Sequence, residues 1–176
     1  MTKWDEYIGA RREGHVIRAV DALISVRAFF KEGGAEIYND DDYSTQEALD
    51  KDGKKVDPGS KEAVRWNLFG ALEKFRAPSI VYLWNPDLVS LIAKRMVAEA
   101  ILLHNFPTGA AASDLQDVIV GFCDSHRTGY GSMINLLNTA IEENAPATYT
   151  DPAKVDAAAE EAQSAVYGPF DWKSKP

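Results

Sequence analysis

The sequence predicts an all-α protein, a compact bundle of five or six helices with a small irregular acidic hairpin inserted between the first two. Three observations predict this fold. Apolar residues recur at helical spacing in several separate segments of the chain. Asn-Pro or Asp-Pro pairs precede three of those segments, as is typical of helix N-termini. With 176 residues, the chain is long enough for one domain with a core of its own.

The first predicted helix begins at Val16 and ends before the pair Gly33-Gly34. Its apolar residues fall on one side, and polar residues such as Arg18 and Asp21 fall on the other. The apolar side consists of Val16, Val20, Leu23, Ile24 and Phe30. We expect this side to face the core.

The segment of residues 39–56 is rich in acids and small polar residues, and Asp52-Gly53 within it indicates an irregular hairpin. A calcium-binding loop would require a glycine at its sixth position, which sets the register on Gly53. The first ligand position is then Ala48 and the twelfth is Gly59, and neither offers a side-chain ligand. The sequence therefore excludes an EF-hand and predicts a solvated turn.

The next segment carries the clearest helical spacing. Asp57-Pro58 is a helix-opening pair, and Pro78 is a stop. The apolar positions between them are Val64, Leu68, Ala71, Leu72 and Phe75. Arg65 and Trp66 lie inside this predicted helix. They are either binding residues of a pocket facing Asp124, or an arginine tied to a carboxylate beneath a packed indole.

Two further helices are indicated by their caps. Asn85-Pro86 opens one that is apolar on several sides over residues 88–103, as expected for a central helix. Ser113 and Gln116 form a capping box ahead of the next. The pair Gly129 and Gly131 then brackets a predicted break before a helix that ends near residue 144.

The last predicted helix opens at Asp151-Pro152, and its alanine-rich apolar face predicts weak packing. We therefore divide the chain into a single helical domain over residues 1–150 and a C-terminal helix with an aromatic tail over residues 151–176. Phe170 and Trp172 in the tail are predicted binding residues that dock on the body or on a partner.

Composition narrows the classes of partner. Nineteen Lys and Arg residues against 27 Asp and Glu residues give a formal net charge of −8, which disfavours general nucleic-acid binding. No apolar stretch is long enough for a membrane span, and the charged N-terminus lacks the apolar run of a signal peptide. One cysteine cannot form an internal disulfide. We expect a soluble, cytoplasmic protein without membrane contact.

Two pairs of motifs carry a family resemblance. Residues 52–58 and 63–72 read DGKKVDP and AVRWNLFGAL, and residues 124–128 and 136–141 read DSHRT and LLNTAI. These motifs are similar to the Asp-Gly-basic turn, the Arg-Trp-Cys-Leu-x-Gly-Ala-Leu helix and the closing Arg-Thr and Leu-Leu-x-x-Ala-Ile pattern of a family of small, uncharacterised, mostly actinobacterial and phage proteins, the domain of unknown function 6197.

The resemblance implies a compact helical domain and a bacterial or phage origin, and it brings no reaction, cofactor or catalytic residue with it. The chain departs from the family pattern at several positions. Asn67 stands where cysteine is common in the family, and Phe122-Cys123 stands where Trp-Asn is common. No site built on those side chains is carried over.

Asp124, His126 and Arg127 are the candidates for catalytic chemistry, and Cys123 lies beside them. Cys123 ends a predicted helix, where the dipole raises a thiol pKa, so we predict a core or half-buried thiol. The three histidines do not have the spacings of metal-binding helices. We expect no metal and no cofactor.

These observations lead to a small non-catalytic bacterial or phage protein that acts through protein-protein contact or self-association. One alternative is an enzyme whose cleft gathers Arg65, Trp66, Asp124, His126 and Arg127. Another is a virion or assembly component that uses the aromatic C-terminal tail.

Overall fold

The computed structural model describes residues 2–32, 36–37, 48–75, 84–106, 114–125, 130–145 and 151–168. These residues form six helices and three two-residue strands, so the predicted all-α class is confirmed. The helices are α1 (Lys3–Lys31), α2 (Leu68–Lys74), α3 (Pro86–Leu103), α4 (Leu115–Ser125), α5 (Tyr130–Asn144) and α6 (Pro152–Tyr167). The strands are β1 (Glu36–Ile37), β2 (Ala48–Leu49) and β3 (Arg65–Trp66).

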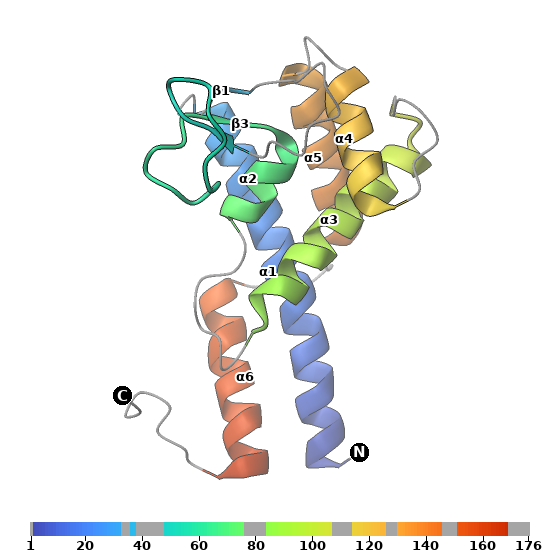
Figure 1. The fold of residues 1–176 in the computed structure, drawn as a ribbon. Coiled ribbons are helices and arrows are strands. Elements are labelled where there is room, and N and C mark those ends of the chain that lie inside the picture. The colour runs from blue at the N-terminus through green and yellow to red at the C-terminus, as the bar shows by residue number, and fades with distance from the viewer. Residues whose placement is uncertain are drawn as a thin grey trace.

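The helices form a body and a protruding stalk (Figure 1). The C-terminal half of α1 enters the body with α2, α3, α4 and α5. The N-terminal half of α1 leaves the body and pairs with α6, which runs antiparallel to it. We call this two-helix projection the stalk, and its free end, near Trp4 and Tyr167, the tip.

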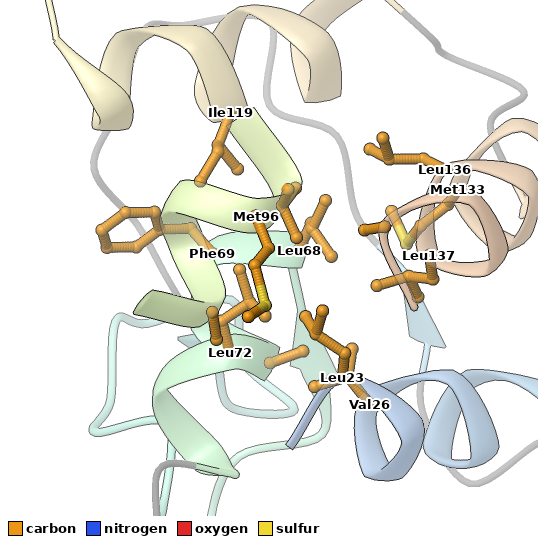
Figure 2. Close-up of a cluster of buried hydrophobic side chains, with 14 of the residues drawn as sticks. Leu23, Val26, Leu68, Phe69, Leu72, Met96, Ile119, Met133, Leu136 and Leu137 are labelled. Atoms are coloured by element: carbon orange, nitrogen blue, oxygen red, sulfur yellow. The ribbon is translucent and has the colours of Figure 1, made fainter. Parts of the chain in front are cut away.

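The body has one hydrophobic core (Figure 2). Five helices contribute side chains to it: Leu23 and Val26 from α1, Leu68, Phe69 and Leu72 from α2, Met96 from α3, Ile119 from α4, and Met133, Leu136 and Leu137 from α5. Burying a side chain of this size stabilises the fold by about 1.5 to 3 kcal/mol. The body therefore supplies most of the apolar stabilisation, and the stalk is anchored to it through α1.

Helix α1 begins at Lys3, so the predicted start at Val16 is wrong. A capping box fixes the true start. The amide of Asp5 donates to the Thr2 hydroxyl at 3.2 Å, and the Asp5 carboxylate accepts from the Thr2 amide at 2.8 Å. Around Ala10 and Gly14 the helix packs on α6 through small residues, which do not give the large apolar stripe on which the prediction depended.

The acidic hairpin is confirmed in its described part. The Asp50 amide donates to the Lys54 carbonyl, and Leu49 bridges to Lys55. Gly53 has a φ of +79°, a conformation that favours glycine. The Asp50 carboxylate accepts from the amides of Asp52 and Lys54, both at 2.8 Å. The acid at this turn therefore orders the backbone, as in a solvated turn.

The predicted helix after Pro58 is wrong in its first half. Arg65 and Trp66 form β3, the middle strand of a three-stranded sheet that the sequence did not predict. Trp66 pairs with Ile37 in parallel β1 and with Ala48 in antiparallel β2. Helix α2 begins only after Asn67, whose side-chain oxygen accepts from the Gly70 amide at 2.7 Å.

The remaining predicted helices are confirmed. Asn85 caps α3, where its Oδ1 accepts from the amides of Asp87 and Leu88. Asp151 caps α6 in the same way, through the Ala153 amide. Helix α5 begins at Tyr130, so the predicted break does not include Gly131, which is helical.

Helix α4 also forms where it was expected. The side chain of Asp114 accepts from the Asp117 amide at its start, whereas the predicted cap residue Ser113 and also Gly129 lie outside the described residues. None of the helices in the described part of the chain combines the length and the apolar character that crossing a bilayer requires.

Candidate functional site

Trp66, a predicted binding residue, is buried where β3 meets the body. Its indole N–H donates to the Pro58 carbonyl at 2.9 Å. The Phe29 ring packs edge-on against it with centroids 5.0 Å apart, and the Lys74 ammonium lies 5.0 Å from its ring centroid. Arg65, beside it on the strand, is half-buried. The indole is therefore fully engaged in packing.

Most of the other predicted site residues fall outside the described part of the chain. These are His126, Arg127, Phe170 and Trp172. The backbone of Asp124 belongs to the last turn of α4, but its side chain is outside the description. Of the five residues of the predicted catalytic cleft, the structure thus describes the side chains of Arg65 and Trp66.

The described cysteine and histidines are used in packing and in pairing. Cys123 is buried in α4, as predicted for a core thiol. His104, at the C-terminal cap of α3, pairs through Nε2 with Glu143 of α5. Within the described ranges, no three His, Cys, Asp or Glu side chains come close enough together to hold a metal ion.

A polar cluster that the sequence analysis missed lies where the stalk joins the body. We call His15, Arg18, Trp84 and Asp156 the waist cluster. The Asp156 carboxylate accepts from the Trp84 indole N–H at 2.7 Å and from Arg18 Nε at 3.1 Å, and it also pairs with Arg18 Nη2. Trp84 and Arg18 are both buried. One carboxylate thus joins α6 to α1 and to Trp84, which lies two residues before α3.

His15 completes the waist cluster from α1. Its Nδ1 donates to the Arg11 carbonyl at 2.6 Å, so Nε2 is left as an acceptor for the Asn85 amide at 3.3 Å. The imidazole packs edge-on against Trp84, with ring centroids 5.2 Å apart. This geometry requires the neutral ring, because a proton on Nε2 would face an N–H donor.

The polar groups of the waist cluster bind one another and join separate parts of the chain. The Asp156 carboxylate accepts from three N–H groups, one on Trp84 and two on Arg18, and both imidazole nitrogens have partners. A general acid or base needs a lone pair or proton that can reach a substrate, and the groups of Asp156 and His15 are already bonded within the protein. In the sequence, the pair Gly14-His15 is a local signal of the cluster. It places a glycine, which leaves room for a neighbouring side chain, next to a polar ring on a helix.

The waist cluster predicts how stability responds to pH. Burial lowers the pKa of His15 below its ordinary 6.5, and the hydrogen bond to Arg11 offsets this only in part. The unfolded chain then binds the proton more readily than the folded protein does. The contribution of His15 to the free energy of unfolding is therefore fully present above pH 6.5 and falls as the pH drops below it. Urea denaturation from about pH 7.5 to 5.5 should show this loss, and the His15→Gln variant should show a smaller one.

Asp21 is expected to change the stability in the opposite direction from His15 as the pH falls. Burial raises the pKa of Asp21, with Arg18 opposing and Asp151 and Asp156 adding to the rise. The folded protein therefore binds that proton more readily, and Asp21 contributes stability as the pH falls toward 3.8. Equal slopes for wild type and His15→Gln between pH 7.5 and 5.5 would contradict the role of His15.

The stalk tip carries an aromatic cluster of three rings. Trp4, Tyr7 and Tyr167 pack edge-to-face, with centroids 5.5 to 6.0 Å apart. Arg11 donates to the Tyr7 hydroxyl at 2.9 Å and lies over its ring. Trp4, Tyr167 and nearby Ile8 are each between 49 % and 58 % exposed. Large apolar side chains therefore meet solvent at the tip.

Between the tip and the waist, α1 and α6 are held by small side chains. A hollow of about 160 Å³ separates them, lined by residues such as Gly14, Ala158 and Ala159. Ligand pockets usually enclose about 300 to 1,000 Å³, so this hollow is below the usual size of a ligand pocket. A comparison with protein-family models, with curated proteins and with solved structures finds no match to this chain.

Proposed function

We propose that this protein acts by binding another protein through the stalk tip and carries no catalytic site. The observation that carries the proposal is the exposure of Trp4, Ile8 and Tyr167 on adjoining helix ends. Tryptophan and tyrosine are enriched at the energetic centres of protein interfaces, where they bury a large area with few rotatable bonds. Their water-exposed faces are available to a partner.

The construction of the stalk supports the same role. The two helices project from the body, so a partner can approach the tip without displacing the body core (Figure 1). Edge-to-face packing holds the Trp4, Tyr7 and Tyr167 rings in place before binding. Pre-ordered side chains lose less conformational entropy on association, which favours affinity.

The partner that fits this surface is a protein with an apolar groove. On the motif resemblance, we place the interaction in the cytoplasm of a bacterium or of a phage-infected cell. Assembly into a virion would use the same kind of contact. The occupied groups of the waist cluster and the engaged indole of Trp66 favour contact over catalysis.

Site-specific photo-crosslinking tests the proposal. A benzophenone amino acid replaces Tyr167 at the tip or, as the matched control, Tyr130, an exposed tyrosine at the start of α5. In the native cell, the probe at position 167 should give one dominant protein adduct that mass spectrometry identifies, and the probe at 130 should not. Adding Trp4→Ser should reduce the adduct. Equal labelling at both positions, or none at 167, would reject the proposal.

A further inference from the structure

Helix α3 exposes an apolar stripe on its outer side. Leu88, Leu91, Leu102 and Leu103 are between 40 % and 71 % exposed. Arg95 and Glu99 lie between them and are joined by an ion pair of 2.7 Å. At about 100° per residue these six residues, which we call the outer stripe, cover roughly a third of the helix circumference.

The outer stripe is separate from the core and from the stalk tip. The opposite side of α3, including Val89, Ala93, Val97 and Ile101, is buried in the body. In Figure 1 α3 crosses in front of α1. Four exposed leucines on one helix form an apolar surface of the kind that marks an interface.

Four of the six residues of the outer stripe are placed symmetrically about the level of Val97, and Leu88 and Leu102 are the two that are not. Arg95 lies two residues before this point and Glu99 two residues after it. Leu91 and Leu103 lie six residues before and after it. A second copy of α3 crossing antiparallel at Val97 would therefore bring each Arg95 to the level of the other copy's Glu99, and each Leu91 to the level of the other copy's Leu103.

We infer that two copies of this chain form a two-fold symmetric dimer through the outer stripes of α3. An isologous interface requires a surface that is complementary to itself, and the pairs Arg95 with Glu99 and Leu91 with Leu103 meet that requirement in their spacing. The existing Arg95–Glu99 pair leaves the stripe without net charge, so the two stripes themselves do not repel each other. This dimer does not depend on the stalk tip, which stays free for another protein.

Charge reversal of the full-length protein tests the dimer by sedimentation equilibrium. Wild type should sediment with twice the chain mass. Arg95→Glu places four carboxylates around the two-fold axis, and it should weaken association at least about tenfold. The double variant Arg95→Glu with Glu99→Arg restores opposite charges across the axis, and it should restore the dimer.

The control is Val64→Glu, which adds one acid at an exposed apolar position outside α3 and should leave the mass unchanged. Because Arg95 and Glu99 are exposed, all variants should melt within a few degrees of wild type. A wild-type monomer at about 100 µM would overturn the inference. So would a dimer insensitive to Arg95→Glu, or a double variant that folds and remains monomeric. None of these outcomes bears on crosslinking at Tyr167.

Discussion

Replacing Asp156 with alanine is expected to lower the free energy of unfolding by about 3 kcal/mol. The carboxylate is the acceptor for the Trp84 indole at 2.7 Å and the main counter-ion of Arg18, whose side chain is only 8 % exposed. Without it, the Asp21 carboxylate at 3.7 Å is the one acid that the described part of the chain leaves to the guanidinium, and the indole N–H loses its acceptor. A buried charge that loses its partner is among the most destabilising changes in a protein.

Urea denaturation at pH 7 measures the effect, and Glu161→Ala is the matched control. Glu161 is an exposed acid on the same helix, so its removal should change the unfolding free energy by less than about 0.5 kcal/mol. Asp156→Asn should fall between the two, because an amide oxygen can still accept from Trp84 but does not neutralise Arg18. Comparable values for Asp156→Ala and Glu161→Ala would show that the waist cluster does not hold the stalk.

The second large effect is expected for Gly14→Ala, which should destabilise the protein by about 1 to 3 kcal/mol. A methyl group at this position would lie 2.0 Å from the ring of Trp84. Trp84 cannot yield easily, because it is buried and its indole N–H is bonded to Asp156. The clash exceeds the gain of about 1 kcal/mol that alanine brings to a helix interior.

Gly9→Ala in the same helix isolates the clash from helix propensity. No atom lies within 4 Å of the methyl group it adds, so this variant should be as stable as wild type or more stable by up to about 1 kcal/mol. Thermal unfolding followed by circular dichroism measures both. If Gly14→Ala also raises the melting temperature, Trp84 does not pack against α1 as described.

The sequence was informative where local signals decide the structure. Asn85 and Asp151 cap α3 and α6 because a side-chain oxygen reaches amides within the next three residues. Gly53 turns the hairpin because its φ is positive. The prediction for the residues around Trp66 was wrong because distant residues, and not local signals, decide the structure there. Val64 and Leu68 are spaced as in a helix, but Trp66 is held by Ile37 and Ala48, which are remote in the sequence.

The waist cluster could not be predicted, because Arg18 and Asp156 are 138 positions apart. The sequence analysis placed Arg18 on the polar side of its helix, whereas the structure buries it against α6. That error has a physical origin, since periodicity distinguishes apolar from polar residues but does not show which polar residue has a buried partner. The aromatic cluster at the stalk tip was missed as well, because Trp4 and Tyr167 come from the two ends of the described chain.

The pairing of α1 with α6 has a consequence for the order of synthesis. The first half of α1 emerges from the ribosome early, but its packing partner is made only after α2 to α5. Closing so long a loop is slow and entropically costly, so we expect the stalk to form after the body has folded. A chain interrupted anywhere between the two helices would retain Trp4 but lack the finished tip. On the proposed function, only molecules translated through α6 would then be competent to bind a partner.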